Sequence, residues 1–192
     1  MNIDPQDIRH AVAARAQDAQ KFLCELIATP SLPGAESAVT ELARDAFSPL
    51  AEVQRLQMSN SLREDKDYSD PVEGIEYEGR CNLRVCLPGS GRGRKLLFNA
   101  HLDTVPPSQG QQEPFRPRVE NGLVYGRGAC DDKGQVASMY LAMAAMKDLS
   151  VGLDGDLIVH LVAEEEVGGN GTLAMIRAGE AADGCIVLEP SE

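Results

Sequence analysis

Apolar residues recur every three to four positions at the start of the chain, which is the spacing of one helix face. The pattern predicts a helix over residues 5 to about 28, and Thr29-Pro30 marks its end. After the loop SLPGAES, a shorter run of the same period predicts a second helix over about 36–47. The beginning of the chain is therefore expected to be mainly helical.

The rest of the chain alternates short apolar runs with helical patterns. LLFNA is a continuous apolar run of the kind found in buried strands, and the Ala- and Met-rich stretch over 133–149 predicts a buried helix. Strands are expected near residues 53–58, 81–87, 95–100, 156–163 and 183–188, and a further short helix at 171–178. This alternation predicts an α/β fold with a largely parallel sheet covered on both faces.

Two loops interrupt this pattern. The segment SNSLREDKDYSDPVEGIEYEGR is polar, mostly acidic and aperiodic, so residues of about 60–80 are expected to form a flexible, disordered surface loop. The glycine-rich GSGRGRK joins two predicted strands and no helix follows it. A strand-connecting turn is therefore favoured over a phosphate-binding loop, which needs a helix N-terminus behind it.

Composition narrows the possible function classes. The chain has 192 residues, 43% of them hydrophobic, which is enough for one domain with a sizeable core. A formal charge of −12 and the absence of Trp argue against nucleic acid as a partner. The start is polar and no stretch reaches membrane-spanning length, so we expect no membrane association and a cytoplasmic location. Five scattered cysteines without a CxxC pair predict no disulfide framework.

Polar side chains gather where the predicted strands end. His101 and Asp103 follow LLFNA, whereas Glu165, Glu166 and Glu189 follow the next two strands. In α/β sheets the ligand site lies at the carboxyl ends of the strands. We therefore expect these residues to meet at one edge of the sheet.

One imidazole among several carboxylates is a ligand set that zinc accepts. Two ions about 3.5–4 Å apart need a bridging carboxylate, and a water bound between them reaches a pKa of about 7. A separate carboxylate must take the proton of that water and return it to the leaving amine. The adjacent Glu165 and Glu166 can divide this labour, and Asp103 can accept the other ring N–H of His101.

Four motifs in this order, HLDTVP, YGRGACDDKG, AEEEVGG and VLEPS, make the chain resemble the dinuclear-zinc deacylase and peptidase family. This family includes acetylornithine deacetylase, succinyl-diaminopimelate desuccinylase, aminoacylase and glutamate carboxypeptidase. The stretch TPSLPGAES also resembles the family's early loop. The resemblance implies a three-layer αβα zinc-peptidase domain with a mostly parallel mixed sheet.

The resemblance also implies a ligand set for two zinc ions, with Co²⁺ or Mn²⁺ as alternative metals. His101, Asp131 and Glu189 would hold one ion. Asp131 would bridge to the second ion, which Glu166 binds. Asp131 rather than Asp132 matches the bridging position, and the peptide bond after it is often cis in this family.

By the same resemblance, Glu165 is the general base and Asp103 the partner of His101. The implied reaction is hydrolysis of an amide bond in an N-acyl amino acid or a small peptide, through a metal-bridging water. Deacylase activity and dipeptidase or carboxypeptidase activity both stay open. A third interpretation is a catalytically incomplete fragment or a non-enzymatic binding module.

The third interpretation rests on two departures from the family pattern. Family members are longer, with a lid or dimerisation domain after the last motif, and their second zinc takes a histidine from late in the chain. His10 and His160 do not match that ligand, and His160 is expected in the core. Residues 1–192 are therefore expected to be the N-terminal segment of a catalytic domain, inactive alone and homodimeric in a full-length form.

Overall fold

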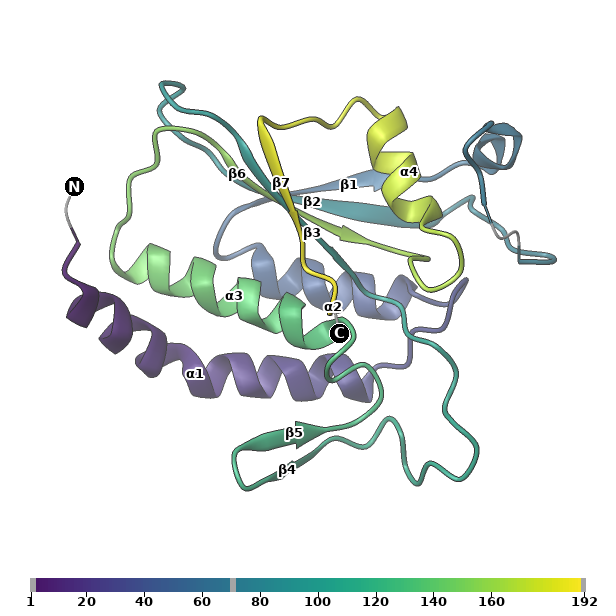
Figure 1. Cartoon of the computed structure of the whole chain (residues 1–192), viewed down its shortest axis with the longest axis horizontal. Coiled ribbons are helices and arrows are strands. Elements are labelled where there is room, and N and C mark those ends of the chain that lie inside the picture. Colours follow the sequence, from purple (N-terminus) through teal and green to yellow (C-terminus); the bar gives the residue numbers. More distant parts are fainter. Residues whose placement is uncertain (1–2, 70–71, 191–192) are drawn as a thin grey trace.

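The computed structural model of the chain describes residues 3–69 and 72–190, so residues 70–71 of the predicted acidic loop lie outside it. A five-stranded sheet in the order β1-β2-β6-β3-β7 forms the centre, and β4 and β5 form a separate hairpin (Figure 1). The strands are β1 (Glu52–Gln57), β2 (Cys81–Leu87), β3 (Leu96–His101), β4 (Arg118–Glu120), β5 (Leu123–Tyr125), β6 (Leu157–Val162) and β7 (Gly184–Val187). The helices are α1 (Pro5–Ala28), α2 (Ser37–Phe47), the 3₁₀ helix η1 (Asn60–Glu64), α3 (Lys133–Asp148) and α4 (Asn170–Arg177).

The central sheet is mixed. β3 pairs in parallel with both β6 and β7, whereas β2 pairs antiparallel with both β1 and β6. Four strands consequently run in one direction and β2 alone runs against them. The predicted α/β fold with a mostly parallel mixed sheet is confirmed.

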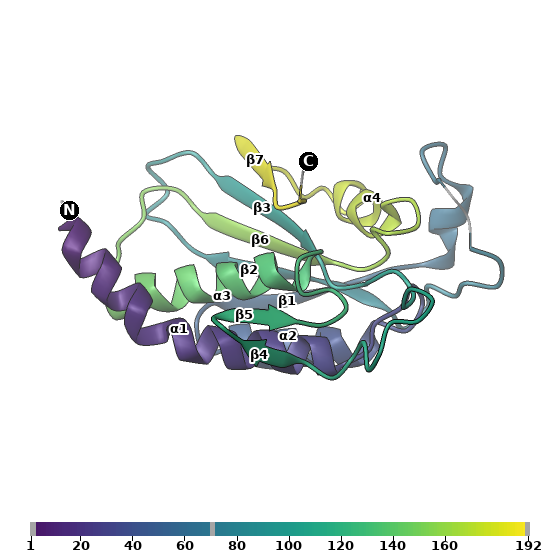
Figure 2. The ribbon, with the colours of Figure 1, turned by 60° about the horizontal axis from the view of Figure 1, so that its bottom comes forward.

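Helices lie on both faces of the sheet. Figure 2 shows α1, α2 and α3 together on one face and α4 on the other. The side chains between the first three helices and the sheet form the main core, and they include Phe22, Leu26, Phe47, Leu83 and Val159. The opposite face is more open, and Ile186 and Val187 of β7 remain 45% and 61% exposed.

Local signals account for the best-predicted element. The side chain of Asp4 accepts a hydrogen bond from the Gln6 amide, and Pro5 occupies the first turn, where its missing N–H has no intrahelical partner to lose. The helix ends at Ala28, and Thr29 follows it with extended backbone. The predicted and observed bounds of α1 therefore agree.

The hairpin of β4 and β5 was not predicted. Each strand has only three residues, and Val119, Leu123 and Tyr125 are exposed. Such short strands carry no measurable alternation of buried and exposed positions. Their pairing is visible only in the folded chain.

The segment between β1 and β2 is less exposed than its polar sequence indicated. Ile75 and Tyr77 are buried, and they pack with Met58, Leu62 and Ala163 in a second small core. The prediction of a surface loop was wrong for these side chains, because isolated apolar residues in an acidic run give no periodic signal. The flexibility of the segment stays a prediction.

Glycines hold the turn between β2 and β3 against the turn before β6. The Gly93 amide donates to the Asp154 carbonyl at 2.8 Å, and an added Cβ on Gly155 would lie 1.9 Å from the Arg94 carbonyl oxygen. GSGRGRK is thus a strand-connecting turn, as predicted.

A helix with the length and hydropathy of a membrane span is absent from the described part of the chain.

Candidate metal centre

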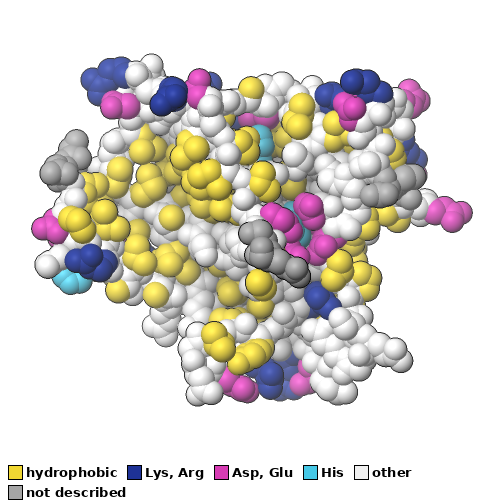
Figure 3. Space-filling model, in the orientation of Figure 1, with side chains coloured by type: hydrophobic (Ala, Val, Ile, Leu, Met, Phe, Trp, Pro, Cys, Tyr) yellow, Lys and Arg dark blue, Asp and Glu magenta, His cyan; other side chains and the backbone are white. Residues whose placement is uncertain are grey.

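Three parallel strands bring the candidate residues to one edge of the sheet. β3 ends at His101, which lies opposite Val162 at the end of β6, and Glu165 and Glu166 follow β6 directly. β7 lies on the other side of β3, and the chain reaches Glu189 two residues after its end. Figure 3 shows acidic side chains gathered beside a histidine in the middle of this face. The predicted meeting of strand ends is confirmed.

His101 is the centre of the group and is 1% exposed. Its Nε2 lies 2.9 Å from Asp131 Oδ1, 3.6 Å from Glu189 Oε2 and 3.9 Å from Glu165 Oε2. Its Nδ1 lies 3.1 Å from the carbonyl oxygen of Asp103 and 3.4 Å from its carboxylate. One ring nitrogen therefore faces three carboxylates, while the other faces Asp103.

Asp103 also organises the glutamates. Its Oδ1 accepts a hydrogen bond from the Glu165 amide at 3.0 Å, and its Oδ2 accepts one from the Glu166 amide at 3.1 Å. The side chain of Asp103 is fully buried. Asp103 thus connects the end of β3 to the turn after β6, a contact that the sequence did not predict. Its role as the orienting partner of His101 stays a prediction.

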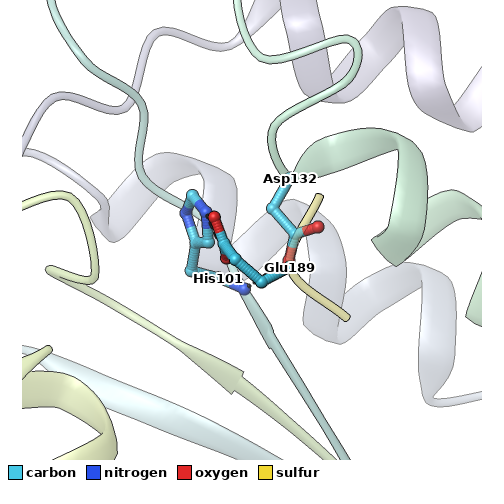
Figure 4. A group of neighbouring side chains, drawn as sticks. All are labelled: His101, Asp132 and Glu189. Atoms are coloured by element: carbon cyan, nitrogen blue, oxygen red, sulfur yellow. Dashed lines mark hydrogen bonds and ion pairs between the residues drawn. The ribbon is translucent and has the colours of Figure 1, made fainter. Parts of the chain in front are cut away.

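Two overlapping groups of side chains have the composition of metal ligands. His101, Asp131 and Glu166 offer ligand atoms that all lie within 4.8 Å of one another. The same holds for His101, Asp132 and Glu189, which converge from three segments of the chain (Figure 4). The predicted residues are therefore brought together, and Asp132 joins Glu189 beside His101.

Asp132 is the site residue that the sequence analysis assigned no role. It is fully buried, its Oδ2 accepts a hydrogen bond from the His101 amide at 2.9 Å, and its Oδ1 has no partner among the described residues. The peptide bond between Asp131 and Asp132 is cis. The signal in the sequence was the adjacent Asp-Asp pair, which does not by itself tell which carboxylate turns inward.

Lys133 follows the two aspartates and is the first residue of α3. It is fully buried, and its Nζ donates to the carbonyl oxygens of Leu26 and Thr29 at 2.8 and 2.9 Å. These acceptors lie at the end of α1, so the lysine ties the start of α3 to another helix. Burial lowers the pKa of Lys133 to about 8.

Electrostatics shows an excess of negative charge around His101. Burial by itself lowers the pKa of His101, but hydrogen bonds and charges of Asp103, Asp132 and Asp131 raise it to about 10. Burial raises the pKa of Asp132 to about 7, with Glu189 and Asp131 adding to the rise. These shifts show that a positive charge is favoured beside the ring.

The glutamates show the same effect. Burial raises the pKa values of Glu165, Glu166 and Glu189, and neighbouring carboxylates raise them further. Within the described residues, none of the three forms an ion pair with lysine or arginine. A bound cation would neutralise this cluster, and the imidazole and carboxylate donors with the unpartnered Asp132 Oδ1 fit a divalent metal.

The fold and the site together define a class. The carboxyl edge of the mixed α/β sheet carries two overlapping His-carboxylate groups, which have the ligand composition of two-metal hydrolases. Residues 97–192, half of the chain, match Peptidase family M20/M25/M40, and the chain belongs to this family. The resemblance found in the sequence motifs is thereby confirmed at the level of the family.

Individual relatives cover the chain to different extents. The N-formyl-4-amino-5-aminomethyl-2-methylpyrimidine deformylase of Bacillus subtilis (strain 168) is 39% identical over 121 residues, which are 60% of this chain and 28% of that protein. Human carnosine dipeptidase 1 has a similar structure, with a TM-score of 0.77 at 19% identity over 97% of this chain and 41% of that chain. A dinuclear metal-binding peptidase of the M20 family from Bacillus subtilis has a TM-score of 0.59 at 16% identity, covering 87% and 40%. The chain thus spans less than half the length of each of these proteins.

Proposed function

We propose that the protein is a zinc-dependent amidohydrolase that removes an acyl group from a small N-acyl amine or N-acyl amino acid. The observation that carries the proposal is the convergence of two His-carboxylate groups on His101, within 4.8 Å, with Glu165 beside them. His101, Asp131 and Glu189 would hold one ion, and Asp131 with Glu166 would hold the other. When bound, the two ions supply a polarised carbonyl and an acidified water.

The two adjacent glutamates divide the remaining work. Glu166 Oε1 accepts a hydrogen bond from the Val105 amide at 3.1 Å and belongs to a ligand group. Glu165 belongs to neither group, and its carboxylate lies 3.9 Å from His101 Nε2 with 38% of the side chain exposed. Glu165 is therefore free to take a proton from water and return it to the leaving amine. Burial raises its pKa, which is the direction that makes a carboxylate a stronger base.

The substrate class rests on the relatives. The relative that is 39% identical is a deformylase, so cleavage of a small acyl group from an amine is the favoured reaction. The dipeptidases among the similar structures are less than 25% identical, and they support the fold alone. Dipeptide hydrolysis is therefore kept as the second candidate, to be separated by assay.

The test of the mechanism is Glu165→Gln, which keeps the size of the side chain and removes its basicity. We expect turnover to fall at least about 100-fold, in the range of general base catalysis, while bound zinc stays as in the native protein. Zinc content by atomic emission and hydrolysis of N-formyl and N-acetyl amino compounds measure the two effects. Loss of zinc would show instead that Glu165 is a ligand.

The substrate assay needs a matched panel. N-formyl amines, N-acetyl amino acids and dipeptides are compared at equal concentration with zinc present. Preference for the acylated compounds supports the deacylase, and preference for dipeptides supports the second candidate. Zinc binding without hydrolysis of any of them would favour the non-catalytic interpretation for this chain.

A further inference from the structure

A buried ionic network lies next to the glutamate turn and includes Glu164, the residue before Glu165. The guanidinium of Arg80 donates to Glu36 Oε1 at 2.7 Å and to Glu164 Oε2 at 3.0 Å. The side chains of the three residues are 7%, 2% and 0% exposed, in the order Arg80, Glu36 and Glu164. The arginine therefore neutralises two buried carboxylates that are far apart in the sequence.

Glu164 is the end of this network that approaches the active edge. Its Oε1 accepts hydrogen bonds from the Tyr77 hydroxyl at 2.5 Å and from Asn170 Nδ2 at 3.0 Å. Its φ is 59°, in the left-handed region that residues other than glycine rarely adopt. Burying a charge in this conformation is unfavourable unless its partners hold it.

The conformation of Glu164 sets the direction of the next two residues. The carboxylate of Glu164 binds Arg80, while the amides of Glu165 and Glu166 both donate to the carboxylate of Asp103. The turn is thus held by two sets of contacts, those of its amides with Asp103 and those of Glu164 with the buried network. Neither set involves a carboxylate of the candidate ligands Glu166 and Glu189.

The acidic segment between β1 and β2 supplies the partners of Glu164 and of the turn that follows it. Arg80 and Tyr77 both come from it, and Ser69 of the same segment donates its hydroxyl to the Gly168 carbonyl at 2.6 Å. Ser69 and Asn170 also exchange two hydrogen bonds, at 2.9 and 3.2 Å. A segment that the sequence indicated to be a free surface loop therefore packs against the glutamate turn.

We propose that Arg80 and Tyr77 are positioning residues that hold Glu165 and Glu166 in their working orientation through Glu164. The proposal rests on the proposed function for what the two glutamates do, but not for how they are held. Arg80 is suited to the task because its planar guanidinium bonds two carboxylates at once, which a lysine ammonium cannot match in geometry. Removing such outer partners commonly weakens metal sites.

The first measurement is amide hydrogen exchange of the chain without metal, at a temperature well below unfolding. Tyr77→Phe removes the hydroxyl that bonds Glu164 and Tyr68, and Arg80→Lys keeps the charge without the planar guanidinium. We expect the amides of Glu165 and Glu166 to exchange about tenfold faster in each variant, the effect of losing one buried hydrogen bond. The amides of β6 should exchange at the native rate.

Arg63→Lys is the matched control. Arg63 lies in the same segment and its guanidinium also faces the Tyr77 ring, at 5.7 Å from the centroid, but it pairs with the exposed Glu76 and not with Glu164. Its variant should leave exchange at Glu165 and Glu166 unchanged. Unchanged exchange in Tyr77→Phe and Arg80→Lys would overturn the proposal, as would equal acceleration throughout β6, which indicates only general loosening.

The second measurement is calorimetric titration with zinc. In Arg80→Lys we expect affinity for the ion on the Glu166 side to fall about 10- to 100-fold, with the ion on the Glu189 side bound as in the native chain. Equal weakening of both ions, or of neither, would count against positioning. A native chain that binds no zinc would contradict the proposed function, whereas the exchange rates would still decide whether the network holds the turn.

Discussion

The amino ends and the carboxyl ends of the central strands differ in the contacts that hold them. At the amino ends of β3 and β6, backbone groups satisfy one another: the amides of Ser90, Arg92 and Gly93 donate to the turn before β6 at 2.8–2.9 Å. At the carboxyl ends, one buried histidine faces a cluster of carboxylates with raised pKa values. The first end is joined by close backbone contacts and by paired charges such as Arg92 with Asp154, whereas the second gathers carboxylates that pair with no lysine or arginine among the described residues.

The amino ends therefore contribute to the stability of the domain, whereas the carboxyl ends carry its candidate metal site. Close backbone contact leaves no room for a ligand, and it joins the two turns by backbone hydrogen bonds. The carboxylate cluster is unfavourable in the apo protein, since like charges are held together away from water. Such an arrangement persists in folded proteins where function requires it.

Gly155→Ala should lower the free energy of unfolding more than any other change proposed here, and it should disturb only the amino ends of the strands. The added Cβ would lie 1.9 Å from the Arg94 carbonyl oxygen, so backbone must move. We expect the free energy of unfolding to fall by about 3 kcal/mol, measured by urea denaturation, with zinc affinity of the folded protein unchanged.

Gly152→Ala in the same loop is the control. No atom lies within 4 Å of its added Cβ, so its stability should stay within about 0.5 kcal/mol of the native value. Equal stability of the two variants would mean that close backbone approach does not hold this edge together.

Zinc should act at the carboxyl edge alone. At a free zinc concentration 100 times the dissociation constant, we expect the free energy of unfolding to rise by about 2.7 kcal/mol, and EDTA should reverse the gain. His101→Ala should abolish most of this gain. His10→Ala, which changes an exposed histidine of α1, should keep it. A gain that survives His101→Ala would place the metal elsewhere.

Glu189→Gln should change stability least. It should stabilise the protein without metal and weaken the stabilisation by zinc. The raised pKa of Glu189 means that its charged form is disfavoured in the folded apo protein, so its neutral isostere should stabilise that state. Because the side chain is 40% exposed and solvent screens its charge, we expect only about 0.5 kcal/mol. Stabilisation by zinc should fall at the same time.

Glu52→Gln is the control for the charge change, since Glu52 lies on β1 away from the cluster. It should leave both thermal stability and zinc binding as in the native chain. A similar rise in stability in the two variants would reflect the change in net charge. It would contradict the prediction that repulsion among the carboxylates at the carboxyl edge destabilises the protein without metal.

Local sequence accounts for most of the elements and for where the site lies. The α1 helix was predictable because its cap, its first-turn proline and its terminating Thr29-Pro30 are neighbours in the chain. The motif residues were predictable as a group because the ends of parallel strands share one edge. The β4 and β5 hairpin escaped because its strands are too short for any period.

What each carboxylate does required the folded chain. The Asp-Asp pair is visible in the sequence, but only the packing of α3 shows Asp132 buried under His101 and grouped with Glu189. The support behind the glutamates was equally hidden, because Arg80 and Glu164 are 84 positions apart. A pattern read over neighbouring residues cannot show such pairs.

The sequence by itself therefore determined most of the helices and strands, the α/β class, the edge of the sheet that carries the chemistry and the family. The tertiary structure alone decided the strand order β1-β2-β6-β3-β7, the partition of the acidic residues into two groups and the attachment of the acidic segment to the glutamate turn. The physical reason is range. Periodicity, capping and turn chemistry act between neighbours, whereas ligand geometry and buried ion pairs depend on contacts made across the whole chain.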